Sequence, residues 1–321
     1  NVIDKRIPTA IPHEAVHLGV LGGYGSAAND RSLAASADMP LGGGFVVHAD
    51  GSYAQSDDMR IGGRALTPAL RAQALQSALL PLEEGSEVDF AANAAVADKL
   101  PNTAARTWTG SLGAAYIGEG GSIGVAYSHF DSRYGVPIRF ATAPGQGQEA
   151  PRIQLRQDRI DARVELDTNG SVIDSASFRY AYGNYSHFEL GPNGSVGTAF
   201  YNQGMEGRLE LTQTQHGAWR GVTGLQFMMR DFNVVGDEAF LPRNSTAQLG
   251  LFTLQQFDLD PLKVELGGRY ERTSQRSQPG SGQAQFFDGE LTYASFSASA
   301  GASYEFAPDW KLGVKIGRAH V

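Results

Sequence analysis

Two pairs of histidine and carboxylate residues are the side chains best suited to metal chemistry. His129 and Asp131 lie two positions apart, and His187 and Glu189 repeat this spacing further along the chain. A neutral imidazole beside a carboxylate is a suitable set of ligands for zinc. We predict the first pair at the outer end of a strand and the second in the next outer loop. The alternative interpretation is that all four are surface residues that bind no ligand.

Other patterns that resemble catalytic motifs have simpler interpretations. Gly118–Gly121 is rich in glycine, but it opens no helix and fits a hairpin turn better than a phosphate loop. The serine ladder Ser295–Ser299 lines one face of a strand, and no nucleophile elbow is present. No predicted helix carries two histidines at the i,i+4 spacing of a zinc protease. We therefore predict no catalytic residue, no bound cofactor and no enzyme activity.

Strands must position these side chains, and the clearest pair of strands spans Asp260–Phe306. Between Leu262 and Tyr270 apolar residues alternate with lysine, glutamate and arginine. Between Thr292 and Phe306 they alternate with serine and glycine. One apolar face and one polar face is the pattern of a half-buried antiparallel sheet. Aromatic residues at the ends of the apolar face are typical of strands that cross a membrane in a β-barrel.

The composition excludes several classes of protein. The chain has 321 residues, of which 40 are glycine and none is cysteine, and its net charge is -8. A disulfide scaffold and thiolate metal sites are excluded, and an acidic chain does not suit nucleic-acid binding. No run of about 18 apolar residues is present, which excludes a helical membrane protein but not a barrel. The chain does not start with a signal peptide, so either it is cytosolic or its true start is missing.

The connections between about thirteen predicted strands are sorted by length. From the second connection onward, tight turns such as Asn169–Gly170 alternate with long polar loops. The largest loop, 56–103, holds a helix predicted from Thr67 to Leu80 and a second short helix within 87–100. Tight turns at one end and long loops at the other are the layout of an outer-membrane barrel. Bacterial barrels close with an even number of strands, so thirteen indicates an incomplete one.

The distribution of charge agrees with this layout. The apolar faces of the strands near Ile160, Met205, Leu262 and Thr292 carry no charged residue. A lysine or arginine at the lipid midplane would cost about 2–4 kcal/mol. The opposite faces carry both signs, which predicts ion pairs between neighbouring strands on the wet side of the sheet.

Several segments resemble the TonB-dependent outer-membrane receptors. The sequence NVIDKRIP at Asn1–Pro8 is similar to the end of the plug domain in that family. The sequences RIQLRQDRIDARVEL at Arg152–Leu166 and VGTAFYNQGMEGRLEL at Val196–Leu211 are similar to the barrel of its zinc-uptake branch. The resemblance implies an antiparallel transmembrane β-barrel of about 22 strands around a plug. It assigns residues 1–12 to the end of the plug and 13–315 to an incomplete barrel of about 12–13 strands, with the plug itself missing.

Two segments depart from the family pattern. The loop Ile138–Gln148, which follows Tyr134–Pro137, lacks the histidines that are common there in the zinc branch, and this weakens zinc as the cargo. Residues 316–321 do not continue the family's pattern, and we predict that they are a non-native tail.

The resemblance implies a receptor in the outer membrane of a Gram-negative bacterium that imports a metal ion or a metal chelate, such as zinc or chelated iron, by energy-coupled transport. Its partners would be the plug, the TonB complex, outer-membrane lipid and lipopolysaccharide. Three arginines near an outer strand end could bind lipopolysaccharide phosphate or pair with acids in the lumen: Arg152, Arg156 and Arg159. The alternatives are a passive porin-type channel, a secreted all-β binding protein and an outer-membrane phospholipase.

Overall fold

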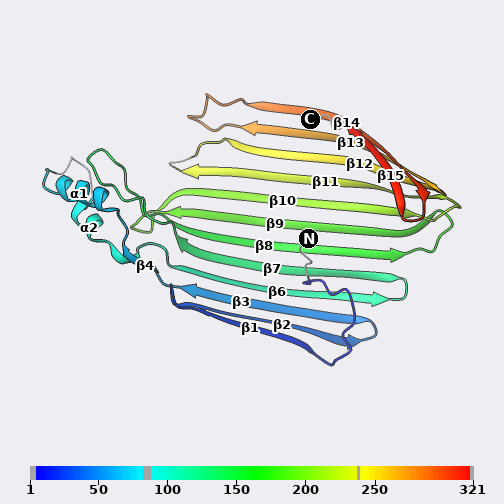
Figure 1. The fold of residues 1–321 in the computed structure, drawn as a ribbon, viewed down its shortest axis with the longest axis horizontal. Helices are drawn as coiled ribbons and strands as arrows, with labels where there is room; N and C mark the ends of the chain where they lie inside the picture. Colours follow the sequence, from blue (N-terminus) through cyan, green and yellow to red (C-terminus); the bar gives the residue numbers. More distant parts are fainter. Residues whose placement is uncertain (1–4, 82–87, 237–238, 319–321) are drawn as a thin grey trace.

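One antiparallel sheet of 13 strands forms most of the molecule in the computed structural model, which describes residues 5–81, 88–236 and 239–318 (Figure 1). Successive strands of the main sheet pair with each other, most of them joined by short turns or loops, whereas a long segment joins β3 to β6. The thirteen strands are β1 (His17–Gly25), β2 (Asp30–Gly42), β3 (Phe45–Ser56), β6 (Ala105–Gly118), β7 (Gly121–Gly135), β8 (Arg152–Asp167), β9 (Ile173–Leu190), β10 (Val196–Gln213), β11 (Trp219–Gly236), β12 (Arg243–Leu259), β13 (Leu262–Gln278), β14 (Gly289–Ala307) and β15 (Trp310–Arg318). The count agrees with the sequence-based prediction.

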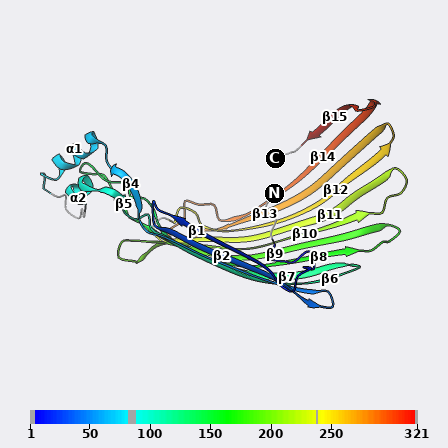
Figure 2. The same cartoon turned by 60° about the horizontal axis from the view of Figure 1, so that its bottom comes forward.

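The sheet curves into a trough with one concave and one convex face (Figure 2). Large apolar side chains on the convex face are open to the surroundings: Leu112 is 66%, Leu266 45% and Phe296 62% exposed. Among the described residues, no second layer of protein packs on this face. We call the convex side the outer face and the concave side the inner face. The two edge strands of the sheet, β1 and β15, do not pair with each other in the described part of the chain, so the barrel is not closed.

Aromatic side chains border the apolar band of the outer face at both ends. At the end with the tight turns they include Phe45, Tyr116, Trp219 and Tyr304, and at the other end Tyr53, Trp108 and Tyr270. On β6 the girdle residues Tyr116 and Trp108 lie about 26 Å apart along the strand, at about 3.3 Å per residue. Because barrel strands tilt by about 35–45°, this length corresponds to about 20 Å along the membrane normal, close to the apolar band of about 25 Å that membrane barrels present to lipid.

The loop predicted at 56–103 folds into a small module at the long-loop end of the sheet (Figure 1). It contains β4 (Met59–Arg64), α1 (Pro68–Ser77), α2 (Phe90–Ala95) and β5 (Ala97–Leu100). Thr67 caps α1 by accepting a hydrogen bond from the Leu70 amide at 3.4 Å, and Pro68 occupies the first turn, as predicted. The second predicted helix is shorter than expected because its end forms β5. Among the described residues, no helix is long and apolar enough to cross a membrane.

A second loop packs against this module. Ala141 lies in one buried cluster with Ala74, Phe90 and Ala94. Asn93 donates hydrogen bonds to the carbonyl of Ala141 at 2.9 Å and to Gln148 at 2.6 Å. The two long loops therefore form one unit, and the histidine-free loop Ile138–Gln148 is part of it.

The strands β9 and β10 are longer than predicted. A loop was expected at 186–198, yet β9 continues to Leu190, β10 begins at Val196, and the Gly191 amide donates to the Ser195 carbonyl across a tight turn at 2.9 Å. The prediction was wrong because the hydrophobic alternation of β9 is interrupted at Gly183–Ser186, where Asn184 and Ser186 occupy the outer face, although the strand itself continues. Residues Ile316 and Gly317 pair with β14, whereas 319–321 lie outside the described residues. A non-native tail at 316–321 stays a prediction.

Candidate functional site: the inner wall and the seat of the N-terminal segment

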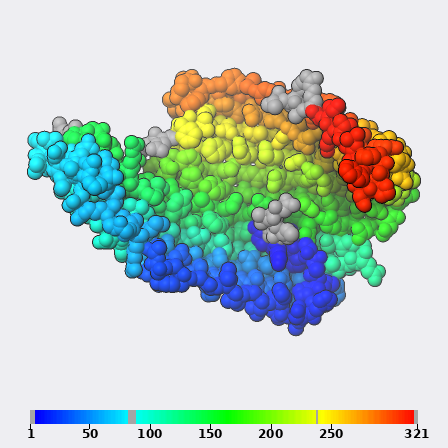
Figure 3. Space-filling model, viewed as in Figure 1, coloured from blue at the N-terminus to red at the C-terminus, as the bar shows by residue number. Residues whose placement is uncertain are grey.

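The N-terminal segment lies against the inner face of the sheet rather than at its edge (Figure 3). Ile7 is only 9% exposed and packs against Ala115 and Ala126. In the register of β6 and β7, Gly113 stands opposite Ala126 and Ala115 opposite Gly124, so four small residues form one shallow seat. A Cβ on Gly113 would collide with the carbonyl of Arg6, and one on Gly124 would collide with the Ile7 side chain. The seat therefore requires glycine at these two inward positions.

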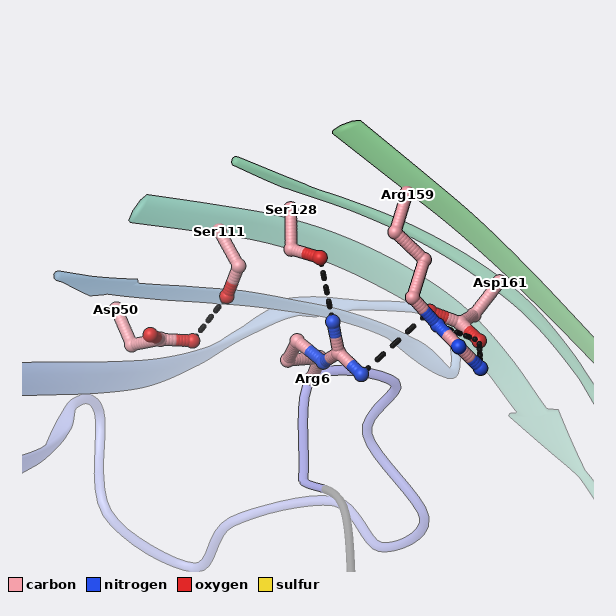
Figure 4. Close-up of polar contacts among 6 residues, drawn as sticks. All are labelled: Arg6, Asp50, Ser111, Ser128, Arg159 and Asp161. Atoms are coloured by element: carbon pink, nitrogen blue, oxygen red, sulfur yellow. Dashed lines mark hydrogen bonds and ion pairs between the residues drawn. The ribbon is translucent and has the colours of Figure 1, made fainter. Parts of the chain in front are cut away.

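Polar contacts fix the same segment to the strands beside the seat (Figure 4). Arg6 donates a hydrogen bond to the Ser128 hydroxyl at 2.5 Å, and its guanidinium lies 3.5 Å from the Asp161 carboxylate. Arg163 donates to the carbonyl of Pro8 at 3.1 Å. Arg159 holds Asp161 through a nitrogen–oxygen distance of 2.7 Å and thereby positions the carboxylate. Shape and charge thus both specify where the segment lies.

A buried polar cluster continues the inner wall next to the seat. His48 is 5% exposed, and its two ring nitrogens lie 2.7 Å from Asp38 and 2.9 Å from Asp50. Ser111 donates a hydrogen bond to the same Asp50. His48 also stands directly opposite Gly113 in the register of β3 and β6. The inner wall beside the seat is therefore polar but internally satisfied.

Ion pairs cover the inner face of the remaining strands. Ion pairs between neighbouring strands occur, as predicted, between Arg179 and Glu165 at 3.7 Å and between Lys263 and Asp258 at 2.9 Å. Lys315 of β15 reaches across β14 to Glu265 of β13 at 3.0 Å. The shortest pairs, however, run along one strand between residues two positions apart: Arg159–Asp161, Arg208–Glu210 and Arg269–Glu271. This geometry follows from the strand itself, because alternate residues share a face and long side chains reach each other. The face presents fixed charges of both signs to a solute.

The four predicted metal ligands do not converge on one site. His129 and Asp131 share the outer face with Tyr127, where His129 contacts Asp158 at 2.8 Å and Asp131 contacts Arg156 at 2.9 Å. The second pair lies on the inner face of β9, not in a loop as expected. Among the described residues, no group of three or more histidine, cysteine or acidic residues could hold a metal ion.

His187 is the more enclosed of the two histidines. It lies beyond the outer aromatic girdle, stacks on Phe200 with ring centroids 4.1 Å apart, and its Nδ1 lies 2.9 Å from the Tyr185 hydroxyl. Burial lowers the pKa of this imidazole, which favours the neutral form that a metal ion requires. Glu189 lies on the same face of the same strand.

The three predicted anion-binding arginines also separate between the faces. Arg152 and Arg156 point outward, whereas Arg159 points inward and pairs with Asp161. Sequence reasoning missed the seat itself. Its signal was present, because the inward positions 111, 113 and 115 of β6 and 122, 124, 126 and 128 of β7 hold only glycine, alanine or serine.

A single-layered antiparallel sheet with an exposed apolar band, two aromatic girdles and a charged inner face defines a membrane-barrel wall. Residues 97–320 match the family described as TonB dependent receptor-like, beta-barrel. The chain belongs to this family. Its members are transport receptors rather than enzymes, which confirms the prediction that the chain is not an enzyme.

Solved structures share the fold at low sequence identity. A protein described as copper transporter OprC is 14% identical, with a TM-score of 0.63, and the match covers 97% of this chain and 47% of that one. The FrpB iron transporter from Neisseria meningitidis is 10% identical, with a TM-score of 0.66 and coverage of 95% and 47%. The ferric yersiniabactin uptake receptor FyuA from Yersinia pestis is 13% identical, with a TM-score of 0.58 and coverage of 95% and 47%. The chain therefore spans about half the length of these structures.

Proposed function

We propose that this chain forms part of the barrel of an outer-membrane receptor that imports a scarce nutrient by energy-coupled transport. The observation that carries the proposal is the seat of the N-terminal segment on the inner wall. There Ile7 is buried and Arg6 is held between Ser128 and Asp161. A chain that enters the barrel along its wall suits a plug that fills the lumen and stays tethered while it moves.

The partners follow from the same proposal. The plug would occupy the lumen, a TonB complex of the inner membrane would supply the force that moves it, and lipid of a Gram-negative outer membrane would cover the apolar band. A passive porin-type channel needs no such seat. A secreted binding protein would leave its outer face in water, with Leu112 and Phe296 more than half exposed, which the hydrophobic effect disfavours.

We propose a metal ion or metal chelate as the cargo. The structural relatives are described as carriers of copper, iron and a ferric chelate, which supports this class. Zinc as the specific cargo is supported only by the resemblance of several segments to the zinc-uptake branch. The loop Ile138–Gln148, which lacks the histidines common in that branch, packs against α1 and α2. Within the barrel, His187 and Glu189 are the predicted ligands that face inward, and they are the first candidates for contact with a passing metal.

Uptake measurements with the complete gene test the function. Cells that lack their own receptors would receive labelled zinc, a labelled ferric siderophore or labelled haem, each with and without a functional TonB complex. We expect accumulation of one cargo that stops when TonB is removed. Equal uptake without TonB would favour the passive channel, and no uptake of any metal cargo would overturn the proposed cargo class.

Disulfide trapping tests the seat independently of cargo, since the chain has no native cysteine. Cysteines at Ile7 and Ala126, which share one buried cluster, should cross-link in intact cells under mild oxidation. The matched control pairs Ile7→Cys with Val125→Cys, whose side chain lies on the outer face of the same strand. Cross-linking of the control pair but not of the test pair would contradict the seat.

A further inference from the structure

A depression of about 340 Å³ lies on the outer face at the long-loop end of β6, β7 and β8. Its lining includes Arg106, Trp108, His129, Asp131, Arg133 and Arg156. Three of these side chains are arginine and only one is an acid. In the larger depression on β9–β14, by contrast, Arg230 and Arg276 are balanced by Asp231 and Glu290. An excess of positive charge therefore distinguishes the first depression.

The strand register brings two of these arginines together without a counterion. Arg106 stands directly opposite Arg133, and Arg156 stands opposite Asp131, which it binds at 2.9 Å. Within the part of the chain that the structure describes, Arg106 and Arg133 have no hydrogen-bond or ion-pair partner. Like charges directly opposite each other destabilise a sheet unless something lies between them to offset the repulsion. A bound anion would do so.

The height of the depression indicates the source of that anion. Trp108 marks the aromatic girdle at the long-loop end, and Arg106 lies two residues beyond it on the same face, about 7 Å further along the strand and away from the midplane. At this height the outer face meets lipid headgroups rather than hydrocarbon. The inner wall of the barrel separates the depression from the route of the cargo.

We propose that this depression binds the phosphate groups of an outer-leaflet lipid, with lipopolysaccharide as the lipid that a Gram-negative outer membrane presents there. Paired arginines suit the purpose because each guanidinium donates two parallel hydrogen bonds to a phosphate. Arg106 and Arg133 bind the phosphate, and Arg156 is oriented by Asp131 at the rim. Trp108 packs beside the headgroup as part of the girdle. This inference rests on the proposed outer-membrane location and not on the identity of the cargo.

Lipid retention by the full-length receptor tests the site. The receptor would be purified in a nonionic detergent, and native mass spectrometry would count the lipopolysaccharide molecules bound before and after titration. We expect the variant R106Q/R133Q to bind at least about tenfold more weakly, since two charge-assisted hydrogen-bonding groups are lost. Mobility in an unheated gel would show that the variant barrel is folded.

The matched control is R243Q/R276Q, which removes the same number of charges from the same end of the outer face on β12 and β13. We expect it to retain lipid like the unmodified protein. Equal losses in both variants, or unchanged binding in R106Q/R133Q, would overturn the site. Full displacement of the lipid by inorganic phosphate at equal phosphate concentration would show a free-phosphate site instead and would also overturn the proposal. Uptake of cargo by R106Q/R133Q cells should persist, which separates this inference from the proposed function.

Discussion

The inner and outer faces of β6, β7 and β8 are built from alternate residues of the same strands, yet they have opposite properties. Inside, Gly113 and Ala126 leave room for a chain, and Asp161 holds an arginine. Outside, Leu112 and Ile160 stand open, 66% and 43% exposed. The same backbone thus meets a polar lumen on one side and lipid on the other. The contrast indicates that the effect of a substitution on stability depends more on whether the position faces inward or outward than on the type of residue.

The strongest way to test the comparison is to place one charge on each face. Leu112→Arg puts a guanidinium in the middle of the outer apolar band, and we expect it to destabilise the protein by about 2–4 kcal/mol. Ser177→Arg puts the same group on the inner face, opposite Glu165 and Glu210, and should change stability by about 0.5 kcal/mol or less. Urea unfolding of the receptor in lipid vesicles measures both. Equal losses would remove the distinction between a lipid side and a wet side.

Two aspartates of β8 test the faces with a smaller change. Asp161 is 16% exposed beside Arg6, whereas Asp158 on the opposite face is 46% exposed beside His129. Asp161→Asn should lower the free energy of unfolding by about 1.5–3 kcal/mol, since a shielded charge pair is lost. Asp158→Asn should lower it by about 1 kcal/mol or less, because water and salt screen the exposed pair. A larger effect at Asp158 would contradict the comparison.

The fold followed from the sequence because its signals are local. Alternation from Leu262 to Tyr270 needs only period two, and the cap at Thr67 needs only its neighbours. The strand end beyond Tyr182 could not be predicted, since Asn184 and Ser186 interrupt the apolar series of the outer face before Phe188 and Leu190 resume it. The contact of Arg6 with Gly113 could not be predicted either. It joins positions more than a hundred residues apart, and it depends on the N-terminal segment packing on the small residues that the register of β6 and β7 brings together.

The glycines of β6 allow the seat to be tested by a single methyl group. Gly113→Ala adds a Cβ that meets the carbonyl of Arg6, and we expect a loss of about 1–2 kcal/mol from overpacking. Gly110 lies three residues earlier on the outer face, where a Cβ would come no closer than 3.9 Å to Trp108. Gly110→Ala should therefore be neutral or raise stability slightly, because alanine restricts the unfolded chain.

Two readouts separate a displaced segment from a general loss of stability. In Gly113→Ala, protease cleavage near Arg6 should become faster while the unheated barrel keeps its gel mobility. In Gly110→Ala, both should match the unmodified protein. Slow cleavage in both variants would mean that the N-terminal segment is held by something other than the small-residue seat.

The smallest expected effect concerns the two opposed arginines of the outer face. In a nonionic detergent without phosphate lipid, Arg133→Gln should raise the free energy of unfolding by about 0.2–1 kcal/mol, because it removes the repulsion from Arg106. The gain should shrink in about 1 M salt, where screening acts over about 3 Å. Arg163→Gln on the inner face of β8 should have the opposite sign, since it removes the hydrogen bond to Pro8. A loss of stability in Arg133→Gln would mean that this arginine holds the folded barrel together by itself, and the bound phosphate would no longer be needed to explain why two arginines face each other.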